Sequence, residues 1–277
     1  MKSQCCIFFD PFSIAFTSSS KSIDDKLCSF FAGYECDKLP DLTINIDTCG
    51  SMPDSLLSSI ESSIPVIDEN KFEIGPGIIR GTRNTVEKLM SIVVHDDFFL
   101  QPTLNIFQVF LYLVYYTLCY EQEIQSCFIH GCGVVCKGRP YLFIGPHGSG
   151  KTTLGLLSGG RILHDDQILL RIYDNKIYIN SPPLSAKDNF RGYMDRSLEI
   201  DKIYVLHKDT SSFAKNCSEK KAFISLYNEI VLPLNLISVD EKMAKKTKFD
   251  LCYAILKSAK LFDLHFTLDI DFNACLV

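Results

Sequence analysis

YLFIGPHGSGKTTLGLLSGGRILHDD, the stretch Tyr141–Asp166, decides the fold that this sequence predicts. Within it, residues 145–152 read GPHGSGKT and fit the phosphate-loop pattern G-x-x-x-x-G-K-[ST] without a mismatch. The apolar run Tyr141–Ile144 predicts a buried strand before the loop, and Thr152–Leu157 is compatible with a helix after it. The pattern therefore occurs in the strand, loop and helix setting that it requires.

The loop residues are candidates for holding a polyphosphate. Glycines let the backbone take positive φ, so that successive N–H groups converge on an anion and pass it to a helix N-terminus. Lys151 is placed to reach the β and γ phosphates, and the Thr152 hydroxyl is placed to bind magnesium. A glycine-rich surface loop with a chance lysine is the alternative. The expected nucleotide-binding residues are Gly145, Pro146, His147, Gly148, Ser149, Gly150, Lys151, Thr152 and Thr153.

Two carboxylates follow the loop closely. Gly159 and Gly160 are expected to end the helix, and Arg161–His164 predicts a brief strand that delivers Asp165 and Asp166 to the sheet end beside the loop. One acid is then available to hold a metal ion, and the other to accept a proton from an incoming hydroxyl. A solvated acidic turn between two strands is the alternative.

Residues 128–170, FIHGCGVVCKGRPYLFIGPHGSGKTTLGLLSGGRILHDDQILL, resemble the nucleotide-binding core of the HPr kinase/phosphorylase family and its smaller relatives. These proteins share a His-Gly strand, a hairpin, the phosphate loop, a short helix and a strand that ends in Asp-Asp. The resemblance implies an α/β fold with an HPr kinase/PEP carboxykinase-like P-loop core, and it implies ATP and Mg2+ as ligands. It places His130 near the transferred phosphoryl group, Asp165 as the general base and Asp166 as a metal ligand.

The sequence departs from the family at two places. It has Thr152-Thr153-Leu154 where HPr kinases carry an acidic residue soon after the Lys-Ser of the loop, and their later Glu and Arg signature survives at most as Phe190-Arg191-Gly192. Arg191 is the best nearby cation for the transferred phosphoryl group, with a surface ion pair as the alternative. The departures weaken the case for HPr as the substrate and favour similarity to shorter relatives, some of which phosphorylate serine or a peptide.

The expected function is an ATP-dependent kinase that transfers the γ-phosphoryl group to a hydroxyl, such as a serine of a peptide or carrier protein, or free serine. The alternative is a nucleotide-gated binding protein that holds a precursor peptide or a partner enzyme without chemistry. The acid missing before Arg191 favours the alternative, whereas the intact aspartate pair opposes it. HPr kinases form hexamers, which leaves a homo-oligomer open.

The composition limits the class of protein and the partners that can be expected. The chain has 277 residues, of which 47% are hydrophobic and 22% charged, which is typical of a globular protein. A net charge of −5 argues against broad binding to nucleic acid or to an anionic membrane. Its twelve cysteines form no C-x-x-C pair and no secretory signal is recognised, so a reducing cytoplasm is expected. Cys127, Cys132 and Cys136 share one predicted strand as small hydrophobes, with a metal site as the alternative.

Two domains are expected, a small N-terminal α/β domain over residues 1–122, a candidate for substrate binding, and the kinase-like domain over residues 123–277. The apolar stretch Thr103–Tyr120 predicts a helix buried between the halves. Asn105, Gln108 and the acidic flank argue against a membrane span there. In the second half, Gln167–Ile172 and Lys176–Asn180 predict a hairpin. A later helix is expected to place Phe249, Cys252, Tyr253 and Leu256 in the core.

Overall fold

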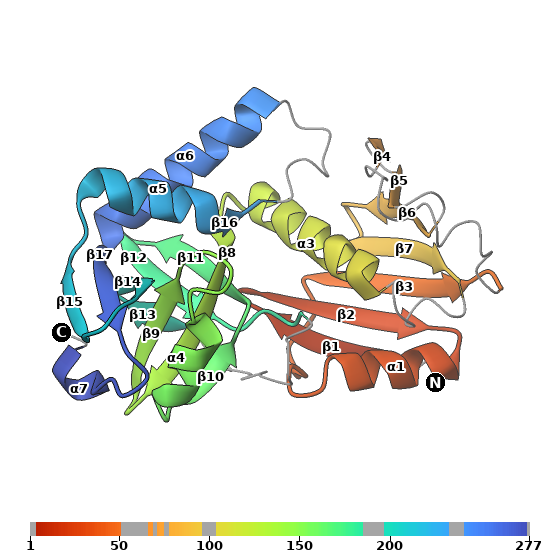
Figure 1. Cartoon of the computed structure of the whole chain (residues 1–277). Helices are drawn as coiled ribbons and strands as arrows, with labels where there is room; N and C mark the ends of the chain where they lie inside the picture. Colours follow the sequence, from red (N-terminus) through yellow and green to blue (C-terminus); the bar gives the residue numbers. More distant parts are fainter. Residues whose placement is uncertain are drawn as a thin grey trace. The chain divides into compact units, whose positions relative to one another are not determined.

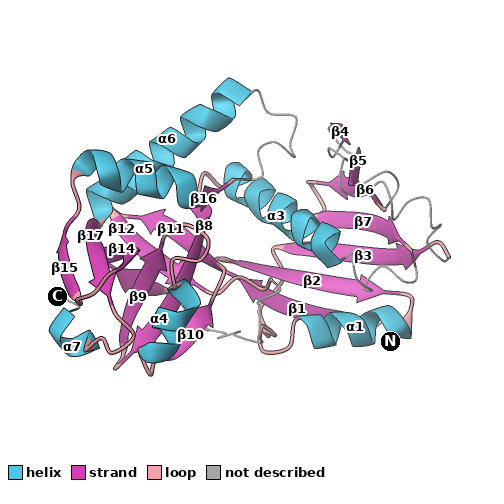
Figure 2. Cartoon of the chain, in the orientation of Figure 1, coloured by secondary structure: helices cyan, strands magenta, loops and turns pink. Residues whose placement is uncertain are grey.

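The computed structural model describes residues 4–50, 66–68, 71–74, 78–95, 104–184, 197–232 and 241–275. The fold is mixed α/β (Figures 1 and 2). The chain forms two compact units, the first made of residues 1–118, 183–185 and 233–241, and the second of residues 119–182, 186–232 and 242–277. The sequence analysis placed the boundary between residues 122 and 123.

The first unit is built on a seven-stranded sheet in the order β1-β2-β3-β7-β6-β5-β4. The strands β2, β3 and β7 run parallel, and every other neighbouring pair is antiparallel. Alternate residues of β3 are buried, as expected for a strand with one face against a core. The elements are β1 (Gln4–Phe9), β2 (Phe12–Ser18), α1 (Lys21–Phe30), β3 (Leu42–Thr48), β4 (Val66–Asp68), β5 (Lys71–Ile74), β6 (Ile79–Asn84), β7 (Leu89–Val94) and α3 (Leu104–Glu121).

An aromatic core joins helix α3 to the first sheet. The ring of Phe107 lies 6.3 Å from that of Phe16 and 6.0 Å from that of Phe31, and Tyr115 lies 4.6 Å from Phe9. Such rings bury large apolar areas and gain further from edge and offset contacts. The apolar circumference of α3 is thus used in packing. No helix among the described residues has the length and apolar character that crossing a membrane would require.

The second unit contains a ten-stranded sheet with the path β13-β12-β11-β8-β9-β14-β17-β15, and β10 and β16 also pair with β8. Neighbours are antiparallel except β9, β14 and β17, which run parallel. The elements are β8 (Gln125–Cys136), β9 (Arg139–Ile144), α4 (Lys151–Leu157), β10 (Arg161–His164), β11 (Gln167–Tyr173), β12 (Lys176–Asn180), β13 (Leu198–Ile200), β14 (Lys202–Lys208), β15 (Phe213–Asn216), α5 (Glu219–Glu229), β16 (Ile230–Val231), α6 (Glu241–Ser258), β17 (Lys260–Phe266) and α7 (Phe272–Cys275).

The second unit has two apolar clusters, and both include residues of the second sheet. Leu226 of α5 and Cys252 of α6 pack with Ile129 and Val205 in one cluster. Leu154 of α4 packs with aromatic residues such as Phe143 in the other. The short helix after the glycine loop is therefore held by a core of its own.

The local elements predicted around the glycine loop are confirmed. Tyr141–Ile144 belongs to β9, α4 runs from Lys151 to Leu157, and Arg161–His164 is β10. The hairpin of β11 and β12 is also confirmed, and both residues of its turn have positive φ, 51° at Asp174 and 56° at Asn175. These are the residue types that tolerate this conformation best after glycine.

The predicted core face of α6 is partly wrong. Cys252 is fully buried, but Phe249 and Tyr253 are each 54% exposed. Leu251 and Ile255 are buried as well, and the predicted Leu256 is partly buried against the same cluster. The helix carries two apolar stripes at helical spacing, and periodicity cannot decide which stripe meets the sheet.

The aromatic core of α3 makes a stability prediction. Replacing the fully buried Phe107 by alanine should lower the free energy of unfolding by about 3–5 kcal/mol, because it removes apolar burial and leaves a cavity. Tyr120→Ala is the control on the same helix and should change it by no more than about 0.5 kcal/mol, since that side chain is 86% exposed. Urea unfolding measures both. Equal effects of the two substitutions would contradict the packing described.

Candidate functional site

The long strand β8 changes partners halfway along its length. Its residues 125–130 pair with β11 and its residues 131–136 pair with β9. The additional strand β16 pairs with the first half, and β10 pairs with the second. Four strand ends therefore meet near His130-Gly131, with Gln167 opposite His130, Ile144 opposite Gly131, Ile230 opposite Ile129 and His164 opposite Gly133.

The segments that carry polar groups are continuous with the strand ends that meet here. The loop of residues 145–150 follows the end of β9, and Asp165-Asp166 joins β10 to β11. Glu229 immediately precedes β16. The N–H of Gly131 donates to the carbonyl oxygen of Asp166 at 3.0 Å, which links β8 directly to the acidic turn. The sheet register thus brings together the loop and the acids that the sequence analysis expected to be neighbours.

The three glycines of the loop have positive φ, 147° at Gly145, 76° at Gly148 and 97° at Gly150. Gly150 precedes the first residue of α4. A Cβ atom there would lie 2.7 Å from Cζ of Phe266, closer than side chains approach one another. Glycine is needed at position 150 for two reasons: the backbone has a positive φ, and there is no room for a Cβ atom beside Phe266.

Lys151 is buried beneath the loop. Its Nζ atom donates to the carbonyl oxygen of Gly145 at 2.6 Å and to that of Pro146 at 3.2 Å. The loop therefore curves around this ammonium group. Among the other expected phosphate ligands, Gly145 is buried and Ser149, Gly150 and Thr152 are half-buried. The exposed ones are Pro146, His147, Gly148 and Thr153.

The acidic turn is shaped by a buried histidine. The Nδ1 atom of His164 accepts hydrogen bonds from the N–H groups of Asp166 at 3.2 Å and Gln167 at 3.0 Å. A register shift in β10 between Ile162 and His164 accompanies this turn. Asp165 is buried and Asp166 is partly exposed, so the two neighbouring acids have different environments.

The pKa of the Cys132 thiol depends on its charged neighbours. The pKa of Cys132 is raised to about 12, first by burial and then by the negative charge of Asp165, while the positive charge of Lys151 opposes the rise. The pKa of this buried thiol therefore depends on both the lysine of the loop and the first acid of the pair. The sequence interpretation of Cys127 and Cys132 as small hydrophobes is confirmed, since both are fully buried in the two clusters.

His130 lies between two carboxylates. Its Nε2 atom is 3.3 Å from Oδ1 of Asp166, and its Nδ1 atom is 2.9 Å from Oε2 of Glu229. The hydrogen bonds to Asp166 and then to Glu229 raise the pKa of His130 to about 9, against the opposing effects of burial and of Lys151. At neutral pH the imidazole is therefore protonated, and each N–H donates to one carboxylate.

The sequence analysis missed Glu229. It is the last residue of α5, it is largely buried, and it lies 99 residues from His130 along the chain. Its one signal in the sequence is an acidic residue directly before the apolar run Ile230–Leu232, since buried acids are rare without a partner. Arg191 falls outside the described residues. Within the described part of the chain, no group of three or more His, Cys, Asp or Glu side chains is arranged to hold a metal ion.

The His130 cluster makes stability depend on pH. The folded protein keeps the His130 proton up to about pH 9, whereas the unfolded chain releases it near 6.5. The folded state binds more protons between these values, so the stabilisation is fully present below pH 6.5 and is lost as the pH rises through 9.

Glu229→Gln keeps the shape of the side chain but removes one charge, so the free energy of unfolding should fall less steeply over that range than in the wild type. Glu199→Gln, at the exposed partner of Lys176, is the control and should keep the wild-type slope. Urea unfolding at several pH values measures the slopes. Identical slopes in all three proteins would contradict the role assigned to Glu229.

Comparison with known proteins assigns the chain to no family. No protein-family model matches the sequence, and no curated protein matches it.

Proposed function

We propose that the protein is an ATP-dependent phosphotransferase that moves the γ-phosphoryl group to a hydroxyl, such as a serine of a peptide or protein, or free serine. One observation carries the proposal: a glycine loop with a full phosphate-loop pattern follows β9 at the point where Asp165-Asp166 and His130 also converge. The order strand, loop, helix, strand and Asp-Asp supports the finer assignment to an HPr kinase/PEP carboxykinase-like P-loop core. The N-terminal unit is then the candidate for substrate binding.

Gly145 to Thr153 are proposed to hold the phosphates of ATP. Positive φ at three glycines allows backbone N–H groups to converge on an anion, and the first N–H groups of a helix have no acceptor within the helix. Lys151 would exchange its two carbonyl acceptors for phosphate oxygens. Because a buried ammonium needs acceptors in either state, this exchange keeps it satisfied.

The side chains beside the loop suit a hard cation. The Thr152 hydroxyl and the Asp166 carboxylate are oxygen donors of the kind that Mg2+ prefers. Bound to these groups and to the phosphates, Mg2+ would neutralise charge on the donor. Asp166 is oriented by His130, whose other N–H is held by Glu229. The same imidazolium places a positive charge beside the proposed position of the transferred group.

The transfer step uses Asp165 as the base. The acceptor's hydroxyl oxygen attacks the γ-phosphorus atom while the bond from that atom to the oxygen of the ADP leaving group breaks. The hydroxyl proton passes to the Asp165 carboxylate, and the products are the phosphorylated acceptor and ADP. Most of the catalytic effect would come from holding these groups in line.

Lys151→Ala should weaken binding of Mg·ATP by about 100-fold or more, because it removes charge-assisted hydrogen bonds to the phosphates worth about 1.5–3 kcal/mol each. Isothermal titration calorimetry measures the affinity. Lys215→Ala, which removes an exposed lysine of the same unit, is the control and should bind like the wild type. An unchanged affinity in Lys151→Ala would overturn the assignment of the loop.

Asp165→Asn should keep the affinity for Mg·ATP within about threefold and lower the transfer rate by about 10²- to 10⁴-fold, since it removes the proton acceptor. Transfer is measured with γ-labelled ATP and serine-containing peptides or free serine. Asp174→Asn, in the turn between β11 and β12, is the control and should change neither quantity. A wild-type transfer rate in Asp165→Asn would contradict the role of Asp165 as the general base. Wild-type binding of ATP without transfer to any hydroxyl would favour the nucleotide-gated binding protein instead.

A further inference from the structure

The carboxyl ends of three parallel strands lie at one edge of the second sheet. β9, β14 and β17 run in the same direction, with Ile144 opposite Val205 and Lys208 opposite Phe266. Ligands of such sheets bind outside the carboxyl ends of the strands. The glycine loop follows β9 at this edge, so the last residues of the other two strands are its neighbours in space.

Lys208 approaches the last glycine of the loop. A Cβ atom at Gly150 would lie 3.7 Å from Cε of Lys208 and 2.7 Å from Cζ of Phe266. A Cβ atom at Gly145 would lie 3.7 Å from the backbone nitrogen of Leu206, two residues earlier in β14. The stem of the Lys208 side chain therefore lies beside the loop, within reach of an anion bound there.

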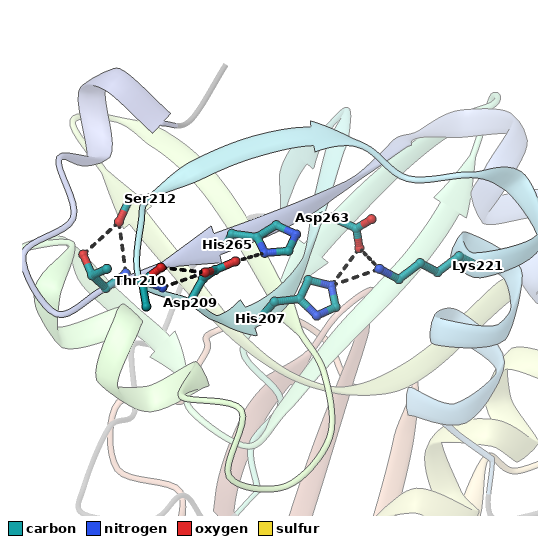
Figure 3. Close-up of polar contacts among 8 residues, drawn as sticks. His207, Asp209, Thr210, Ser212, Lys221, Asp263 and His265 are labelled. Atoms are coloured by element: carbon teal, nitrogen blue, oxygen red, sulfur yellow. Dashed lines mark hydrogen bonds and ion pairs between the residues drawn. The ribbon is translucent and has the colours of Figure 1, made fainter.

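None of the residues that the structure describes compensates the charge of Lys208. The side chain is exposed, and its ammonium group has no hydrogen bond or ion pair to the residues that the structure describes. The neighbouring lysine of α5 differs. The ammonium group of Lys221 contacts Asp263 at 2.6 Å, and His207 lies 2.7 Å from the same carboxylate (Figure 3). The positive charge of Lys221 therefore faces a carboxylate of the chain, whereas that of Lys208 faces solvent beside the loop.

The backbone after Lys208 is anchored. Figure 3 shows Asp209 in contact with His265, whose Nδ1 atom lies 2.7 Å from Oδ2 of Asp209. The N–H of Asp209 donates to the carbonyl oxygen of Phe266 at 3.1 Å, and Ser212 accepts a hydrogen bond from the N–H of Thr267 at 3.0 Å. The turn that follows β14 is thereby tied to the end of β17. This fixes the base of the Lys208 side chain, which is itself exposed.

We propose that Lys208 is a second cation that binds the phosphates held by the glycine loop. This inference rests on the proposed function, because it assumes a polyphosphate at that loop. A triphosphate carries several negative charges, and a lysine acts on them as a mobile point charge. The contact is to phosphate oxygens and does not involve the base or the sugar. Lys208 therefore contributes equally to binding of a nucleotide and of inorganic triphosphate.

The test is calorimetric titration of wild type and Lys208→Gln with Mg·ATP and, separately, with inorganic triphosphate and Mg2+. Lys208→Gln should bind both ligands about three- to tenfold more weakly, with a shallower dependence on salt, because the lost contact is charged and partly solvated. Lys208→Arg should keep most of the affinity. Lys260→Gln is the matched control, since it removes the same charge roughly 20 Å away at the other end of β17. It should bind like the wild type, and all variants should melt at the wild-type temperature.

Each contrary result has a distinct meaning. Equal affinities of Lys208→Gln and wild type, together with a loss in Lys151→Ala, would overturn this inference and leave the proposed function standing. A loss for ATP without a loss for triphosphate would show that Lys208 does not contact phosphate. An equal loss of affinity in Lys260→Gln would overturn the inference, because it would show that the effect of Lys208→Gln comes from the lower net charge and not from a contact with phosphate. A wild-type protein that binds neither ligand would overturn both the inference and the proposed function.

Discussion

The change of partners along β8 is the constraint on which the site depends. A strand of twelve residues cannot leave half of its backbone groups unpaired inside a protein, so each half takes its own neighbours. Those neighbours must begin and end where the change occurs, at His130-Gly131. The glycine loop, the acidic turn and Glu229 are all continuations of strands that end there. Their proximity follows from the hydrogen-bond register of the sheet.

Positively charged side chains near this point each contact negative or polar groups of the chain. The imidazolium of His130 is held between Asp166 and Glu229, and the ammonium of Lys151 is held by carbonyl groups of the loop. The chain as a whole has a net charge of −5, so affinity for a phosphate ligand must arise locally. Lys208 is exposed beside the loop and has no ion pair with the residues that the structure describes. In the proposed function, Lys151 and Lys208 would supply the local positive charge that holds the phosphates.

Local elements were well predicted because local residues specify them. The apolar run of β9, the glycines of the loop and the Asp174-Asn175 turn each restrict the backbone within a few residues. The exposed rings of Phe249 and Tyr253 show the limit of the same reasoning. Helical periodicity places them on one stripe of α6, but the neighbouring stripe of Leu251 and Ile255 packs against the sheet. The choice between the two stripes depends on the shape of the partner surface, which lies elsewhere in the sequence.

The amino-acid sequence by itself determined the order of the local elements, the conformations available to the glycine loop and the candidate residues Lys151, Asp165 and Asp166. Only the tertiary structure decided that Glu229 contacts His130 and that Lys208 lies beside Gly150. Both contacts join residues far apart in the chain and depend on which strands pair and in which register. No short segment contains that information, because a strand's preference for its neighbours comes from packing and hydrogen bonds across the whole sheet.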